Sequence, residues 1–153
     1  MERAVVTANG KDVGCIEPCT TGSYRVLHVV DESLPLVSGY AIRTSGITHA
    51  QMVLGNQAVV LTSPAHQIRE DSAKDTVIDD VKYCRTPLPS GLIHHAIRQR
   101  WPIARELSIV GLSYQRILRA LDSQRFDVLH AHSPVLNGLA ALHAARARGI
   151  PFV

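Results

Sequence analysis

The segment of this chain best suited to chemistry is Phe126–Pro134, FDVLHAHSP. Its apolar run predicts a short buried strand over Asp127–Ala131, and Ser133 is a typical N-cap for a helix that begins at the proline after it. Because residues two apart on a strand share a face, His130 and His132 point the same way. Open α/β sheets bind ligands at the carboxyl ends of their strands, above helix N-termini. The pattern therefore predicts a ligand site that contains two histidines.

The two histidines allow three interpretations. His130 lies deeper in the strand and is typical of a buried histidine that is satisfied by hydrogen bonds. His132 lies at the strand tip, where a histidine can polarise or position a hydroxyl. A metal pair would need a third ligand, and none is evident from the sequence. His28, in the middle of an earlier apolar run, is expected to be structural.

A second strand–loop–helix turn occurs earlier, in RVLHVVDESLPLVSGY at residues 25–40. A small residue at Gly39, just before a helix, allows a phosphate to approach the backbone and the helix N-terminus. The alternative is a plain helix-entry turn, since one glycine does not make a GxGxxG motif. Arg43, on the first helical turn, could contact an anion or remain solvated.

The elements that must position these residues follow from periodicity. The sequence predicts strands over 25–30, 57–62, 81–84 and 127–131, helices over 40–54, 97–121 and 134–148, and a further strand opening at 150–153. This alternation is typical of an α/β fold, with a Rossmann-like parallel sheet flanked by helices and right-handed crossovers. Residues 1–23 are expected to be a poorly ordered leader, and the acid-rich residues 63–80 a mobile surface loop.

Spacing of the larger apolar residues predicts which helix faces are buried. The inward positions are Ile42, Ile47, Ala50 and Leu54 in the first helix; Trp101, Ala104, Leu107, Tyr114, Ile117, Leu118 and Leu121 in the second; and Leu136, Leu139, Ala140, His143 and Ala147 in the third. The other face of the second helix carries Arg98, Arg105, Arg116 and Arg119. That face could be solvated or could contact an anionic membrane surface. Gly149 is placed to end the third helix.

Composition limits the size of the domain, its partners and its location in the cell. The chain has 153 residues, 46% of them hydrophobic and 19% charged, which is enough for one domain with a core. The net charge of +3 suits anionic small molecules but does not indicate nucleic acid. Cys15, Cys19 and Cys84 lack the second pair of a zinc site and indicate reduced thiols. With no signal-peptide pattern and no apolar run of about 20 residues, we expect a cytoplasmic protein.

Motifs of two large enzyme classes are missing from the sequence. It contains no GxSxG turn of the serine hydrolases. It also contains no GxxxxGK[ST] loop, which argues against hydrolysis of ATP or GTP.

Several segments resemble a known family. RVLHVVDESLPLVSGYAIRT, VVLTSP, YCRTPLP and FDVLHAHSPVLNGLAALHAARARGIPFV are similar to the N-terminal domain of family 4 glycosyltransferases of the GT-B fold. More narrowly, they resemble bacterial enzymes associated with exosortase and exopolysaccharide gene clusters. The resemblance covers about residues 24–153, which would form an incomplete acceptor-side domain of a longer enzyme.

The resemblance carries its own expectations for the site. It implies a nucleotide-sugar donor, a polysaccharide or lipid-linked acceptor, and no metal or other cofactor. Ser38 and Gly39 match the family's loop near the donor diphosphate, with Ser38 in place of the first of two frequent glycines. His132 is the better match to the family's histidine near the transferred sugar, and His130 the second. Arg43 and Ser133 would lie in the same cleft.

Two other functions remain open from the sequence. One is a non-catalytic Rossmann-like binding module, and the other is a nucleotide-sugar epimerase of GT-B shape. Because the family's donor domain lies outside these 153 residues, we expect the chain alone to be inactive in sugar transfer.

Overall fold

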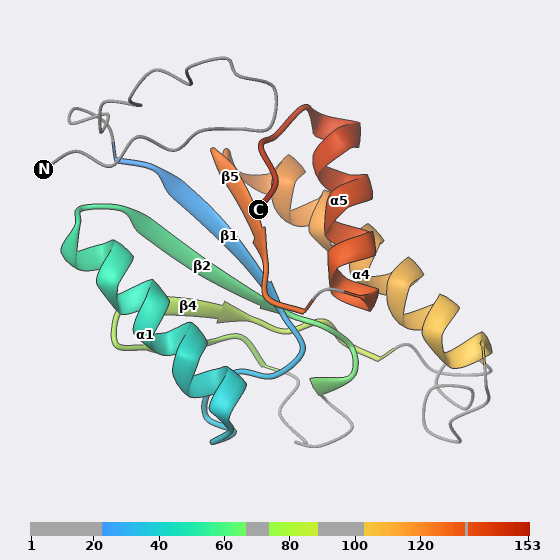
Figure 1. Ribbon diagram of the computed structural model, residues 1–153, viewed down its shortest axis with the longest axis horizontal. Helices are drawn as coiled ribbons and strands as arrows, with labels where there is room; N and C mark the ends of the chain where they lie inside the picture. The colour runs from blue at the N-terminus through green and yellow to red at the C-terminus, as the bar shows by residue number, and fades with distance from the viewer. Residues whose placement is uncertain (1–22, 67–73, 89–102, 134) are drawn as a thin grey trace, which may run out of the picture.

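The computed structural model describes residues 23–66, 74–88, 103–133 and 135–153. The leader expected over residues 1–23 therefore lies almost entirely outside the described residues, as do Cys15 and Cys19. The described strands are β1 (Arg25–Val30), β2 (Gln57–Thr62), β3 (Thr76–Ile78), β4 (Val81–Cys84) and β5 (Val128–Ala131). The described helices are α1 (Gly39–Val53), α4 (Ala104–Ser123) and α5 (Leu136–Arg148). Figure 1 shows α1 on one face of the sheet and α4 and α5 on the other.

The sheet is mostly parallel, with strand order β3-β4-β2-β1-β5. The prediction of an α/β fold with helices flanking a sheet is confirmed. The predicted strands β1, β2, β4 and β5 are parallel to one another, as expected. The sheet also contains β3, which was not predicted and which pairs antiparallel with β4. Asp79 and Asp80 join these two strands with positive φ angles of 49° and 62°, the conformation that a tight hairpin turn requires. Part of the loop expected over 63–80 is therefore a hairpin strand.

Strand positions follow the sequence prediction closely, whereas the start of helix α5 does not. β1, β2 and β4 have the predicted bounds, and β5 begins one residue later than expected. Helix α5 begins at Leu136 after Val135, with no side-chain cap, so the prediction of Ser133 as N-cap is wrong. Instead the Ser133 carbonyl accepts a hydrogen bond of 2.9 Å from the Gly138 N–H. A Cβ at Gly138 would lie 3.1 Å from that oxygen, so glycine permits this close turn.

The buried helix faces differ from those predicted by large apolar residues. Helix α1 buries Ala41, Thr44 and Thr48, whereas Ile42 is 59% exposed. Helix α5 buries Asn137, Gly138, Ala140, Ala141, Ala144 and Ala145. Of its predicted inward residues only Ala140 is fully buried, and Leu139, His143 and Ala147 are exposed. Small side chains let a helix approach its neighbours closely, and the spacing of bulky residues does not reveal this.

The second helix shows the same difference in part. Helix α4 buries Ile109, Ser113 and Ile117. The predicted stripe is right at Ile117, and its Tyr114, Leu118 and Leu121 pack partly buried against the core, but Leu107 is 67% exposed. The helix predicted from residue 97 begins instead at Ala104, because Ile103 before it has a non-helical φ of 63°. Residues 97–102 lie outside the described residues. Among the described residues, no helix is both long and apolar enough to pass through a bilayer.

Two apolar clusters hold the sheet between its helices. Leu27, Val29 and Leu129 pack with Ile117 and the alanines of α5 on the α4/α5 side. Val30, Val60, Val81 and Tyr83 form a smaller cluster. Successive strand residues point to opposite faces, so His28 shares its face with Val30 and points toward α1. The sheet thus has an apolar face under α4 and α5 and a partly polar face under α1.

The end of the chain confirms two predictions. Gly149 ends α5 in the left-handed conformation, with φ of 65°. The residues after it then run parallel to β5, with a bridge between Leu129 and Phe152.

Candidate functional site

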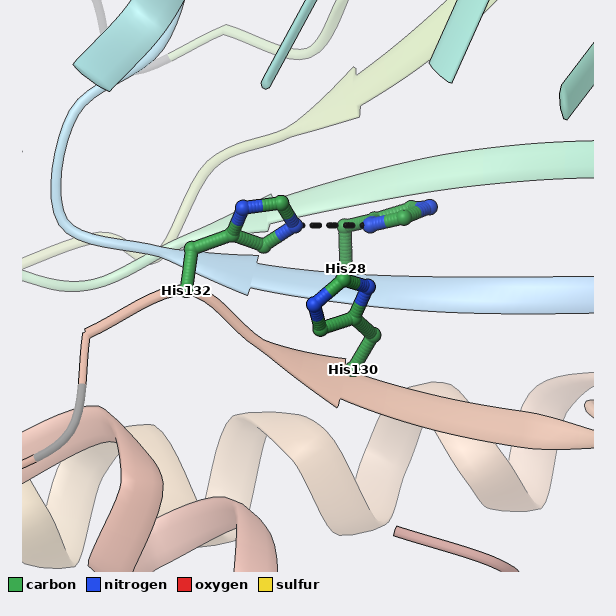
Figure 2. Close-up of side chains that lie close together, drawn as sticks. All are labelled: His28, His130 and His132. Atoms are coloured by element: carbon green, nitrogen blue, oxygen red, sulfur yellow. Dashed lines mark hydrogen bonds between the residues drawn. The ribbon is translucent and has the colours of Figure 1, made fainter. Parts of the chain in front are cut away.

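The centre of the candidate site is a cluster of three histidines from two neighbouring strands (Figure 2). The parallel register of β1 and β5 places His28 directly beside His130. His132 follows β5, and its backbone N–H donates a 2.9 Å hydrogen bond to the Val29 carbonyl. His28 is fully buried, while His130 and His132 are partly buried. The prediction that His130 and His132 lie together is confirmed, since their rings stack 4.3 Å apart.

Hydrogen bonds run through this cluster from one end to the other. A bond of 2.8 Å joins His28 Nδ1 to His132 Nε2. The second nitrogen of His28, Nε2, lies 2.8 Å from the amide oxygen of Gln51. At the other end, Thr44 Oγ1 lies 3.5 Å from His132 Nδ1. His28 is thus a hydrogen-bonding neighbour of His132, which the sequence analysis did not foresee.

Helix α1 supplies the polar cover of this cluster. Thr44, Thr48 and Gln51 recur at spacings of four and three residues, which places them on one face of the helix. That face lies on the histidine side of the sheet, because Thr44 and Gln51 both contact the cluster. The inner face of α1 is small and polar, so the prediction of its buried face from apolar residues was wrong. The same small and polar side chains allow α1 to contact the histidines.

The start of α1 places the predicted loop residues near the same site. Ser38 is the N-cap of α1, and its Oγ accepts a 3.2 Å hydrogen bond from the Ala41 N–H. A Cβ added at Gly39 would meet nothing within 4 Å, so the backbone there is open to a ligand. Arg43 lies one turn further along and donates a 3.3 Å hydrogen bond to the His132 carbonyl. Arg43 thus connects the N-terminal end of α1 with the histidine cluster.

The carboxyl ends of β1 and β2 meet the start of α5 at the same edge. Asp31 Oδ1 accepts hydrogen bonds from Ser63 Oγ at 3.1 Å and from Asn137 Nδ2 at 2.9 Å. Ser133 contributes to this edge through the carbonyl that accepts the bond from Gly138. The edge is therefore braced by polar contacts between three elements.

Burial keeps the three imidazoles neutral. Loss of solvent lowers the pKa of His28 to about 4, against the opposing effect of its hydrogen bond to Gln51. Loss of solvent also lowers the pKa of His132 to about 3, helped by His130, His28 and Arg43. The pKa of His130 is lowered by burial and by the Arg43 charge. At neutral pH the cluster therefore offers uncharged nitrogen donors and acceptors.

We expect this neutrality to make the fold acid-sensitive. In the unfolded chain His28 is protonated below about pH 6.5, whereas in the folded chain its pKa is about 4. The free energy of unfolding therefore falls as the pH drops from 6.5 to 4. For His28 alone the loss by pH 4 is about 3 kcal/mol. Urea unfolding at pH 7, 5.5 and 4.5 measures it.

His28→Asn should make that decline shallower, whereas His143→Asn, at an exposed position on α5, should leave it unchanged. A free energy of unfolding that does not vary between pH 7 and 4.5 would contradict the assignment of buried neutral histidines.

Three histidines also raise the question of a metal. His28 is the third ligand that the sequence did not reveal, and one ring nitrogen of each residue lies within 4.8 Å of the others. However, the rings of His130 and His132 are stacked, with only 21° between their planes. Nitrogen lone pairs lie in the ring plane, so stacked rings do not point at one ion about 2.1 Å from each. The observed geometry suits hydrogen bonding better than metal binding.

The comparisons with known proteins agree with this architecture. Residues 38–153 match the model of the glycosyl transferase 4-like domain. The chain belongs to this family. The family resemblance expected from the sequence is therefore confirmed, while its narrower link to exosortase and exopolysaccharide enzymes is not shown.

One curated relative is a mannosyltransferase. Over 129 residues, or 84% of this chain, the domain is 32% identical to a GDP-mannose-dependent alpha-mannosyltransferase from Mycobacterium tuberculosis. The chain spans about a third of that protein's length, 31%.

A solved hydrogenase domain supports the fold alone. The C-terminal domain of a hydrogenase from Pyrococcus furiosus matches 90% of this chain with a TM-score of 0.56 and 15% identity, over 95% of its own chain. A glycosyltransferase from Rickettsia africae matches 85% of this chain and 28% of its own, with a TM-score of 0.48 and 16% identity.

Proposed function

We propose that the protein is a glycosyltransferase that moves a sugar from a nucleotide-sugar donor to an acceptor hydroxyl. The 153 residues would form the acceptor-side half of a GT-B cleft. The observation that carries the proposal is the position of His132. It lies at the carboxyl edge of the sheet, beside the helix α1 that begins at the predicted donor loop, in a domain of the glycosyl transferase 4-like family.

His132 would hold the acceptor hydroxyl by hydrogen bonding. Its low pKa, about 3, makes it a poor store for a proton but leaves a neutral ring that accepts and donates hydrogen bonds. Sugar transfer forms a bond from the acceptor oxygen to the anomeric carbon and breaks the bond to the diphosphate, and the departing diphosphate would take up the hydroxyl proton. A hydroxyl fixed by His132 would reach that carbon in a productive orientation.

The start of α1 would face the donor diphosphate. Helix N-termini carry partial positive charge and bind phosphate groups. Gly39 leaves open space at this end of α1. Arg43, whose guanidinium is exposed and lies 5.6 Å from the Tyr40 ring centroid, adds a positive charge one turn away.

The choice of donor, acceptor and location belongs to the same proposal. The mannosyltransferase relative makes GDP-mannose the first donor to try. The acceptor would be a polysaccharide or a lipid-linked sugar, handled in the cytoplasm. Helix α4 offers the exposed Leu107 and Arg119 for peripheral contact with an anionic membrane, although Arg105 already pairs with Glu106 at 2.9 Å.

The test is a transfer assay on the complete gene product that contains this domain. GDP-mannose and other nucleotide-sugars are supplied with polysaccharide and lipid-linked acceptors, with and without EDTA. We expect transfer that survives EDTA, because the planes of the stacked His130 and His132 rings do not converge on one point. The 153-residue chain alone should not turn over.

The other outcomes separate the remaining functions. Isomerisation of the donor sugar without an acceptor would indicate an epimerase. Donor binding without turnover in the complete protein would indicate a binding module. Activity lost in EDTA and restored by a divalent cation would contradict the metal-free mechanism.

A further inference from the structure

The hydrogen bonds around His28 fix more than the position of His132. A neutral imidazole carries one proton, so one ring nitrogen donates while the other accepts. When two neutral imidazoles share a hydrogen bond, one ring must therefore donate the hydrogen and the other must accept it. Here the bond joins His28 Nδ1 to His132 Nε2 at 2.8 Å, and a group at either end can set that direction for both rings.

The direction follows from the Gln51 end of the cluster. The amide oxygen of Gln51 is an acceptor, so His28 Nε2, 2.8 Å away, must carry the hydrogen. His28 Nδ1 then holds a lone pair and accepts from His132 Nε2–H. The remaining nitrogen of His132, Nδ1, is left with its lone pair, near the hydroxyl of Thr44 at 3.5 Å.

We propose that Gln51 and His28 are positioning residues that hold His132 in its Nε2–H tautomer and leave Nδ1 as the acceptor at the site. The tautomer itself rests only on the hydrogen bonds, whereas its use toward an acceptor hydroxyl rests on the proposed glycosyl transfer. His28 has no exposed surface, so water does not replace either of its partners. In the free protein this Nδ1 lone pair faces the buried Thr44 hydroxyl at 3.5 Å, and a substrate hydroxyl would take over that contact.

The groups that face His132 from the other elements are consistent with this assignment. His130 stacks on it from β5, and the Arg43 guanidinium lies near its carbonyl from α1. Both disfavour a charged His132. A neutral ring is the condition under which the tautomer matters.

The first test is the nitrogen-15 NMR spectrum of the histidine rings in the 153-residue chain at pH 7. Chemical shifts and long-range couplings distinguish protonated from unprotonated ring nitrogens. We expect both His28 and His132 as Nε2–H tautomers. Nδ1–H forms of these two residues would mean that the Gln51 amide donates instead, and would overturn the proposal.

Variants of Gln51 test whether it sets the direction. Gln51→Glu keeps an acceptor oxygen and should preserve both tautomers. Gln51→Met has similar size but no acceptor, and should give His132 signals averaged between the two forms. Unchanged ring signals in Gln51→Met would show that Gln51 does not set the tautomers of His28 and His132.

Kinetics of the complete protein provide the second test. Gln51→Met should lower kcat about tenfold with little change in the KM for the donor. Gln51→Glu should stay within about threefold of the parent. Gln115→Met, at an exposed position on α4, is the matched control and should have no effect. Equal losses in both Gln51 variants would indicate a merely structural residue.

The two tests separate the two proposals. If no donor supports transfer, the ring spectra still decide the tautomer. If the spectra show Nδ1–H rings while His132→Ala abolishes transfer, the proposed function stands and the assignment of Gln51 fails.

Discussion

Replacing His132 by alanine in the complete protein is expected to lower turnover by roughly 100-fold or more. The loss comes from removing the ring that would hold the acceptor hydroxyl beside the donor sugar. The KM for the nucleotide-sugar should change much less, because the predicted diphosphate contacts lie at Ser38 and Gly39. Steady-state kinetics with varied donor and varied acceptor measure both effects.

The matched control for this substitution is His143→Ala. His143 is an exposed histidine on α5, outside the cluster, and its replacement should leave turnover unchanged. Because His132→Ala also deprives His28 Nδ1 of its partner, thermal unfolding of both variants must accompany the kinetics. Near-parental turnover in a folded His132→Ala protein would return His132 to a structural role.

The second large effect concerns stability and comes from Arg85, which is 1% exposed. Its guanidinium donates hydrogen bonds to Ser33 Oγ and to the Leu34 carbonyl, and it lies 3.0 Å from His66 Nε2. Its backbone N–H donates to Asp75 at 2.9 Å. The Arg85 side chain thereby joins the loop after β1 with the residues that follow β2, and its backbone adds the residue that precedes β3.

We expect Arg85→Met to lower the free energy of unfolding by about 3 kcal/mol, because buried acceptors lose a charged donor that water cannot replace. Urea unfolding at pH 7 measures the change. Arg146→Met, at an exposed position on α5, should change it by less than about 0.5 kcal/mol. A loss below about 1 kcal/mol for Arg85→Met would contradict the bracing role.

The Arg85→Met variant also tests whether the hydrogen bonds of Arg85 affect the candidate site. The loop that Arg85 holds, at Ser33 and Leu34, runs directly into Ser38 and Gly39 at the start of α1. A destabilised loop should therefore weaken donor binding more than it changes acceptor binding.

Strands were more predictable from this sequence than helix faces. Continuous apolar runs bounded by turn residues set β1, β2 and β4 correctly, because strands covered on both faces need such runs. The faces of α1 and α5 could not be predicted in the same way. Their buried residues are small or polar, such as Thr44 and Ala144, and hydrophobic periodicity gives weight to bulk.

The candidate site was only partly predictable for a related reason. The spacing of His130 and His132 brings them to one face, and this is a local property of a strand. His28 joins them through strand pairing, and Gln51 through helix packing, over 104 and 23 residues of sequence from their partners. A single sequence does not show such register. The available signal was that His28 and His130 each lie within a predicted strand, so pairing of these strands could bring them together.

The hairpin of β3 and β4 has a consequence for how this sheet can grow. A short edge strand that turns back on its neighbour is a poor template for further pairing, and β3 has three residues. The opposite edge already carries Phe152 beside β5. We therefore expect an additional strand to pair beyond Phe152 rather than with β3, so growth of the described sheet is favoured in one direction.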